Sequence, residues 1–248
     1  MHEAWEITTS DNRIENQTTI FIIFCEDQND EFYYFRSFQV DNKVKINCIP
    51  NQRKAKLNLL STLEYCNSEG LLDCIDHIYQ IKEGVTENIW CVYDRDLEHT
   101  NMENIKPVDN LNFSTAIDIA KKAGIKVAWS NDSFELWVLL HFELVPNIHK
   151  LHRDYIYNRL TDILQIIPTI KSAYSVLIDN KIFNYKIHLK RREAFLTHIL
   201  PLLKEKMELA IENAKILEKV FEGCVPYHDC NPCTKVHHLV SDLVLAQK

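Results

Sequence analysis

Glycine is scarce in this chain, with 4 glycines among 248 residues. So few glycines argue against a glycine-rich loop that cradles phosphate, and against an all-β fold with many tight turns. Neither a P-loop nor a dinucleotide-binding fingerprint occurs in the sequence. Nucleotide binding through one of these two motifs is therefore excluded.

Long apolar runs are missing as well. No run approaches the roughly 20 residues that span a bilayer, and the segment Met1–Glu6 is mixed polar. A secretory signal peptide would instead begin with a basic segment and continue with an apolar one. We therefore expect a cytoplasmic protein that does not associate with membranes.

Positive charge is also limited. Lys and Arg together number 28 against 35 Asp and Glu, so the formal net charge is −7. Such a chain is not a general basic binder of nucleic acid, and a polyanionic substrate would need local basic patches or metal ions. Runs 53–56 and 186–192 are basic, although such runs more often form a solvated charged face. The second run contains Lys186, Lys190, Arg191 and Arg192.

The most informative stretch is a short apolar run, Ile89–Tyr93, which stops abruptly at two aspartates, Asp94 and Asp96. The run is continuous, rich in β-branched and aromatic residues, and too short for a helix, which predicts a buried strand of a parallel sheet. Ligands bind at the carboxyl ends of such strands, where two carboxylates could hold a hard cation. The alternative is that the strand simply ends in a polar loop.

A second acid follows the first predicted strand. The apolar run Ile20–Cys25 predicts a buried strand and ends at Glu26. Segment 27–38 predicts a short helix, because acids begin it and aromatic residues follow at near-helical spacing. Segment 44–49 predicts another strand. Two strands that both end in carboxylates strengthen the metal hypothesis.

The sequence pattern over residues 89–129 predicts a strand, a helix and a second strand in succession. Helices are predicted over 54–66 and 70–82, and a polar loop over 100–110. A helix over 114–123, with a glycine as its C-cap, leads into a strand over 125–129. Such units form parallel sheets with right-handed crossovers. The predicted fold class is therefore α/β, a parallel sheet flanked by helices.

Glu135 lies just beyond that last strand. Ser130–Ser133 supply oxygens that can cap a helix, and the apolar residues that follow predict a buried helix. Glu135 falls in its first turn, where an acid is often stabilised only by the helix dipole. This turn nevertheless leaves the sheet at the same edge as Glu26, Asp94 and Asp96. We therefore predict that Glu135 belongs to the site.

Helical patterns dominate the second half of the chain. Segments 155–167 and 202–221 each carry an apolar stripe, and no repeat or low-complexity linker separates this half from the first. We therefore expect a core over 1–145 and a helical extension over 146–248 that packs on it. The stripe of 202–221 could also serve self-association, although a place in the core is the simpler account.

Eight cysteines are present, and we expect mostly buried thiols or metal ligands, because disulfides seldom persist in the cytoplasm. Cys230 and Cys233 have the spacing of a zinc knuckle, but zinc ribbons usually present two well-separated ligand pairs. Here the ligands are crowded, so thiols are preferred over a structural Zn²⁺. The crowded residues are Cys224, His228, Cys230, Cys233 and His237.

With these residues, the chain resembles the RloB family of bacterial defence-associated proteins, which is regarded as having a Toprim-like core. Residues 90–96 are similar to the family's central motif, and residues 130–142 to its most specific signature. Glu26 and Glu31, with the Tyr-Phe pair at 34–35, resemble its opening, which reads acid-glycine-x-x-Thr-Glu-x-x-Tyr-Phe.

Near the end of the chain, residues 231–237 are similar to the family's Asn-Pro-Ser-Thr-x-Val-His. This similarity makes Cys233 a serine replacement and further disfavours zinc. The chain departs from the family in its opening motif, where Asp27 stands in place of glycine and Asp30 in place of threonine.

The resemblance implies phosphoryl-transfer chemistry with Mg²⁺ or Mn²⁺. Asp94 and Asp96 would bind the metal, and Glu26 would bind it or act as acid or base. Glu31 and Glu135 would serve a second metal or support the other ligands. No tyrosine is placed for topoisomerase-type covalent attack, so hydrolysis is favoured. The expected function is a metal-dependent nuclease that cleaves DNA or RNA.

Two further expectations come from the resemblance. Lys186 matches a lysine of the family and would contact phosphate. Family members are commonly encoded beside an AAA-type ATPase, so we expect such a partner to gate the activity. The alternative is a catalytically decayed Toprim-like subunit that binds a partner ATPase or a phage component. Asp27 in place of glycine favours this alternative, whereas Glu26, Asp94, Asp96 and Glu135 favour the enzyme.

Overall fold

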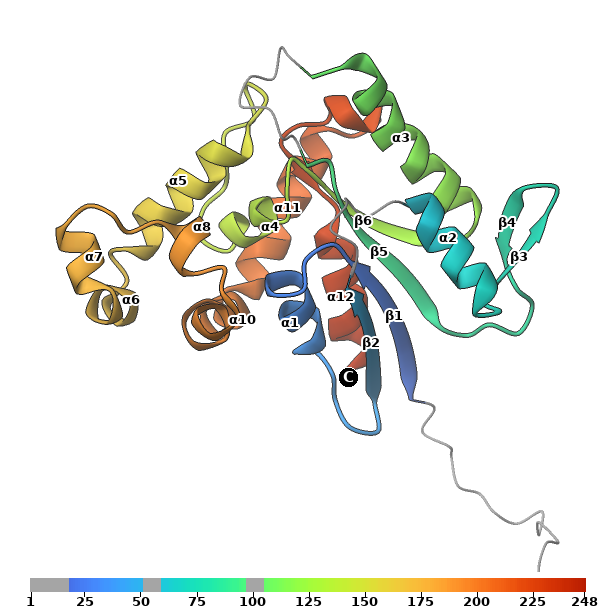
Figure 1. Cartoon of the computed structure of the whole chain (residues 1–248), viewed down its shortest axis with the longest axis horizontal. Helices are drawn as coiled ribbons and strands as arrows, with labels where there is room; N and C mark the ends of the chain where they lie inside the picture. The colour runs from blue at the N-terminus through green and yellow to red at the C-terminus, as the bar shows by residue number, and fades with distance from the viewer. Residues whose placement is uncertain (1–17, 51–58, 97–104) are drawn as a thin grey trace, which may run out of the picture.

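A five-stranded sheet lies at the centre of the computed structural model, which describes residues 18–50, 59–96 and 105–248 (Figure 1). The strand order is β2-β1-β5-β6-β7, in which the first four are parallel and the short β7 pairs antiparallel with β6. The predicted α/β class is confirmed. The strands are β1 Thr19–Cys25, β2 Val44–Pro50, β5 Asn88–Asp94, β6 Lys126–Asn131 and β7 Cys233–Thr234.

Strands β1 and β5 carry continuous apolar runs because helices cover both faces of the sheet. Successive side chains of β1 point to opposite faces. Phe21 and Ile23 join one hydrophobic cluster, and Ile22 and Phe24 join the other. This double burial explains why the strands show continuous apolar runs and no polar alternation.

Helices α2 (Leu59–Ser68) and α3 (Pro107–Lys122) cover one face of the sheet. Because proline is favoured in the first turn of a helix, α3 begins at Pro107, and the loop predicted over 100–110 is wrong from this residue onward. Residues 51–58 and 97–104 lie outside the described residues. They include the basic run 53–56 and the start of the helix predicted over 54–66.

Segment 70–82 forms a β-hairpin, so the predicted helix is wrong. Asp76 and His77 form its two-residue turn with φ of 51° and 64°, the positive values that tight hairpin turns require. Ile75 and Ile78 are 72% and 62% exposed. The apolar spacing that predicted a helix therefore does not mark a buried face. The two strands are β3 Leu72–Ile75 and β4 Ile78–Ile81.

The opposite face of the sheet carries the remaining helices, and one hydrophobic cluster runs from the strands into them. Helices α5, α6, α7, α8 and α10 lie together at the left of Figure 1. The α-helices are α1 Asp30–Arg36, α4 Glu135–Leu140, α5 Arg153–Leu164, α6 Pro168–Ala173, α7 Ser175–Asp179, α8 Tyr185–His188, α9 Arg192–Ala194, α10 Leu200–Glu205, α11 Met207–Val220 and α12 Val236–Ala246. A π-helical turn, Phe195–Ile199, and a 3₁₀ turn, Tyr227–Asp229, complete them.

The helix predicted over 202–221 is interrupted. Lys206 has ψ of 13° and separates α10 from α11. The second half of the chain also supplies β7 to the sheet, and α12 packs on β6. The division into 1–145 and 146–248 stays a prediction. Within the described ranges, no helix combines the length and the apolar character that a membrane span requires.

Candidate functional site

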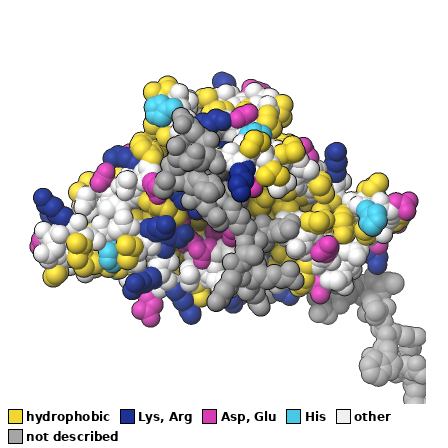
Figure 2. All heavy atoms as spheres, turned by 45° about the horizontal axis from the view of Figure 1, so that its top comes forward, with side chains coloured by type: hydrophobic (Ala, Val, Ile, Leu, Met, Phe, Trp, Pro, Cys, Tyr) yellow, Lys and Arg dark blue, Asp and Glu magenta, His cyan; other side chains and the backbone are white. Residues whose placement is uncertain are grey.

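Three segments of the chain meet where the parallel strands end. Because β5 and β6 are parallel, with Asp94 opposite Ser130, the residues that follow them emerge at the same edge of the sheet. A cavity of about 170 Å³ lies there, which we call the acidic pocket. Its walls include all five predicted acids: Glu26, Glu31, Asp94, Asp96 and Glu135. Figure 2 shows acidic side chains near the middle of one face, with lysine and arginine side chains beside them.

Asp94 is the last residue of β5 and is held by one oxygen only. Its Oδ2 accepts a hydrogen bond of 2.8 Å from the backbone N–H of Phe134. Its Oδ1 is buried and has no hydrogen-bond partner among the described residues. Burial, together with the charges of Glu26 and Glu135, raises the pKa of Asp94 well above its usual value. An ionised Asp94 therefore needs a cation that the described part of the chain does not place on Oδ1.

Glu31 shapes the loop that follows β1. Its Oε2 accepts hydrogen bonds from the backbone N–H groups of Glu26 (2.8 Å) and Asp27 (3.2 Å). Burial, and then the charge of Asp94, raises its pKa strongly. Asp27 is not among the residues with positive φ. The loop therefore accommodates a side chain at the position where the family opening has glycine.

Lys190 occupies one side of the acidic pocket. Its Nζ forms an ion pair with Glu135 and lies 3.3 Å from Asp30 and 3.7 Å from Asp27. Glu135 also accepts a hydrogen bond of 2.7 Å from Ser133 Oγ. Burial alone would raise the pKa of Glu135, but Lys190 lowers it below its usual value. Glu135 is therefore ionised and neutralised by this lysine.

Lys186 does not line the acidic pocket. Its Nζ lies 5.2 Å from the centroid of the Tyr157 ring, and Tyr157 is itself one of the pocket residues. The predicted phosphate contact of Lys186 stays a prediction, while the lysine inside the pocket is Lys190, four residues further on.

Arg153 neutralises the other side of the pocket. It begins α5 and forms ion pairs with Asp96 (2.5 Å) and Asp132 (2.8 Å). Asp96 has φ of 54°, in the left-handed region that few non-glycine residues adopt. One acid of the predicted Asp-x-Asp pair thus forms an ion pair with an arginine, whereas Asp94 Oδ1 has no hydrogen-bond partner among the described residues.

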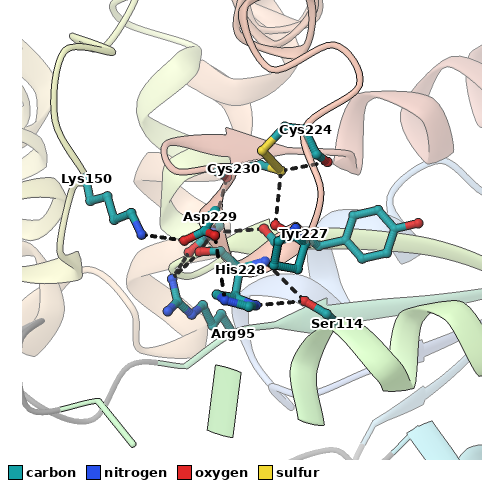
Figure 3. The surroundings of a disulfide bond; sticks show 10 residues. Arg95, Ser114, Lys150, Cys224, Tyr227, His228, Asp229 and Cys230 are labelled. Atoms are coloured by element: carbon teal, nitrogen blue, oxygen red, sulfur yellow. Dashed lines mark hydrogen bonds and ion pairs between the residues drawn. A yellow bond between two sulfur atoms is a disulfide. The ribbon is translucent and has the colours of Figure 1, made fainter. Parts of the chain in front are cut away.

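The cysteine cluster is organised differently from either prediction. Cys224 and Cys230 form a disulfide, so they are neither free thiols nor zinc ligands, and Figure 3 shows their surroundings. His228 Nδ1 lies 3.0 Å from Ser114 Oγ. Cys233 is a buried thiol. The expectation that these cysteines are thiols is therefore wrong for two of the three. The expected compartment argues against a disulfide, but the fold brings the two Cα atoms to 5.9 Å, a separation that a disulfide spans.

His237 contacts Glu218 and not the cysteines of the cluster. Its Nε2 lies 2.8 Å from Glu218 Oε2, and its ring is 1% exposed. Burial lowers the pKa of His237 to about 4. The imidazole is therefore neutral at physiological pH and contacts a glutamate that the sequence patterns did not identify.

Comparison with known protein families accounts for almost the whole chain. The model of the RloB-like protein family matches residues 21–243. The chain belongs to the RloB-like protein family. This match begins in β1 and ends in α12, so it contains every residue of the acidic pocket. No match was found among curated proteins or among solved structures.

Sequence patterns in this RloB-like chain missed both cations of the pocket. Lys190 belongs to the basic run 186–192, but nothing local distinguishes it from Lys186. Arg153 carries no local signal, and the signature around Asp132 does not indicate its partner, because their ion pair joins residues 21 positions apart. Asp30 was noted only as a departure from the family. Its carboxylate is 1% exposed, and burial raises its pKa to about 7 despite Lys190.

Proposed function

We propose that this RloB-like protein is a metal-dependent nuclease of the Toprim type that acts in bacterial defence. The observation that carries the proposal is Asp94 Oδ1, a buried carboxylate oxygen without a hydrogen-bond partner among the described residues, inside a pocket whose acids come from three segments. A buried anionic oxygen is stabilised when a cation coordinates it. Oxygen-only donor sets suit Mg²⁺ and Mn²⁺.

The carboxylates of two pocket residues are suited to bind such an ion. Asp94 and Glu26 would hold it, and Glu31 lies against them through the loop that it shapes. Asp96 was predicted as a further ligand, and Arg153 must share it with the ion. When bound, Mg²⁺ or Mn²⁺ neutralises phosphate charge and lowers the pKa of a water molecule.

The side chains themselves supply charge and proton transfer. Lys190 and Arg153 both line the pocket and pair with different acids, and each could contact an oxygen of a phosphodiester. Glu135 holds Lys190 in place. Glu26 is partly exposed, so it can accept a proton from water and release it to solvent.

The substrate class follows from the size and charge of the site. A cavity of about 170 Å³ accommodates a phosphate group more readily than a whole nucleoside. A nucleic-acid backbone, of DNA or RNA, would therefore lie across the pocket with one phosphodiester inside. An AAA-type ATPase partner remains part of the proposal, because the sequence has no nucleotide-binding motif of its own.

The experiment combines binding with cleavage. Mn²⁺ binding by calorimetry and cleavage of a mixed DNA and RNA panel are measured for the wild type, for Asp94→Asn and for Asp73→Asn. Asp73 is an exposed acid of β3 and serves as the matched control. Binding and cleavage should be lost only in Asp94→Asn. Equal Mn²⁺ binding by all three proteins would contradict the proposal.

A second candidate is a catalytically decayed subunit that binds a partner ATPase or a phage component. The observation in its favour is that Lys190 and Arg153 already neutralise Glu135 and Asp96. This candidate would be supported by two results together. The wild type would bind no Mn²⁺ and cleave no nucleic acid, and the Asp94→Asn variant would still co-purify with the ATPase.

A further inference from the structure

A second cluster of potential metal ligands lies outside the acidic pocket. Glu218, near the end of α11, faces two histidines from the first turn of α12. Nε2 of His237 lies 2.8 Å from Glu218 Oε2, and Nε2 of His238 lies 2.9 Å from Glu218 Oε1. One donor atom from each of the three side chains lies within 4.8 Å of the others.

We propose that Glu218, His237 and His238 bind a divalent transition-metal ion of the class of Zn²⁺, Co²⁺ or Ni²⁺. Two imidazole nitrogens and one carboxylate oxygen suit these ions, whereas Mg²⁺ prefers oxygen ligands alone. Three protein ligands leave further coordination positions for water. This site differs from the sulfur-based zinc site considered from the sequence, since none of its ligands is a cysteine.

The ligands are largely in place before an ion binds. The centroids of the two imidazole rings lie 4.1 Å apart, and α12 packs against both α11 and β6. Donors that are already assembled lose little conformational entropy on binding. His238 is 51% exposed, so an ion can reach the cluster from solvent.

Lys235 is the competing cation. Its Nζ lies 2.5 Å from Glu218 Oε1 and 5.8 Å from the centroid of the Trp129 ring. A bound metal ion must displace this ammonium, because two positive charges at such a distance repel each other. Lys235 and Glu218 both line a cavity of about 560 Å³, which gives the displaced side chain room to move. Removal of the ammonium should therefore tighten metal binding.

The test is a titration of the full chain with Co²⁺, in which the visible absorption of the bound ion measures binding. Mg²⁺ is present in excess throughout to occupy the acidic pocket. Wild type should bind one Co²⁺ with nitrogen and oxygen ligands. His238→Ala should weaken binding by about tenfold or more. Lys235→Met should tighten it by about tenfold. The control His149→Ala, which removes an exposed histidine elsewhere, should change nothing.

Three results would overturn the proposal. The first is equal Co²⁺ affinity of wild type and His238→Ala. The second is the absence of binding by both wild type and Lys235→Met. The third is a thiolate charge-transfer band, which would assign the ion to cysteines. If His238→Ala fails to fold, Glu218→Gln replaces it, provided that its circular dichroism shows a folded protein. None of these results depends on nuclease activity, so the two proposals fail separately.

Discussion

The acidic pocket and the Glu218 cluster have opposite electrostatics. Among the described residues, seven carboxylates and two cationic side chains, Lys190 and Arg153, line the pocket. Around Glu218, one carboxylate meets a lysine and two histidines. Burial raises the pKa of Glu31 well above its usual value. Burial would do the same at Glu218, but hydrogen bonds from its basic neighbours lower the pKa of that glutamate to about 2.

The two regions would therefore bind a metal ion in different ways. The pocket is short of positive charge, so an added cation relieves repulsion between buried carboxylates. The Glu218 cluster already has its cation, so an added ion must displace Lys235. Buried acids without counter-charges are more typical of functional sites than of structural ones. Four experiments test this difference between the two regions.

The largest expected effect is on turnover. Glu135→Gln removes the anion that holds Lys190, so metal-dependent cleavage should fall by about a hundredfold or more, the scale of lost acid–base or positioning help. Glu218→Gln should leave turnover unchanged, because Glu218 lies outside the pocket. Steady-state cleavage assays on both variants decide the matter. Equal losses in the two would mean that the regions are not functionally distinct.

The second-largest expected effect is on the free energy of unfolding. Lys190→Met leaves Glu135 and Asp30 without their shared cation, which should lower the free energy of unfolding by about 2 kcal/mol. The loss is moderated because the Lys190 side chain is 23% exposed and because the acids can take up protons. Lys186→Met, at the end of the same basic run, is the matched control and should be nearly neutral. Urea unfolding at neutral pH measures both, and a similar change in the two variants would contradict the role of Lys190.

Metal addition should produce a smaller gain. If the native pocket binds Mn²⁺ and the unfolded chain does not, a concentration tenfold above Kd should stabilise the protein by about 1.4 kcal/mol. The shift of the thermal midpoint should disappear on removal of the ion with a chelator, and it should be absent in Asp94→Asn. An undiminished shift in that variant would place the ion elsewhere.

The last effect concerns the dependence of stability on pH. Burial raises the pKa of Asp30 from 3.8 to about 7, so between these values the folded state binds more protons than the unfolded state. The contribution of Asp30 to stability therefore falls as pH rises through this range. The pKa of Glu218 is lowered from 4.5 to about 2, so its contribution is present above pH 4.5 and is lost as pH falls below it.

Unfolding curves between pH 4 and pH 7 should separate the two acids. Asp30→Asn should flatten the decline in stability over this range, whereas Glu218→Gln should change the slope only at its acidic end, near pH 4.5. A decline of the same steepness in Asp30→Asn would show that Asp30 is not the titrating group.

The sequence predicted the sheet and its acidic edge well, because both depend on short segments. Continuous apolar runs marked β1, β5 and β6, and their parallel order placed Glu26, Asp94 and Glu135 in one pocket. The hairpin over 70–82 was missed because apolar residues three apart imitate a helical face. Its turn uses Asp76 and His77, which carry no glycine signal.

Apolar periodicity is a property of neighbouring residues, so the amino-acid order by itself determined β1, β2, β5 and β6 and the acids at or just beyond the ends of β1, β5 and β6. Which cation meets which acid was decided only by tertiary packing. Lys190 reaches Glu135 across 55 positions, and Arg153 reaches Asp132 across 21. Glu218 meets His237 because α11 packs against α12. These charge pairings set the pKa of each carboxylate, and only the packed chain brings their partners within reach.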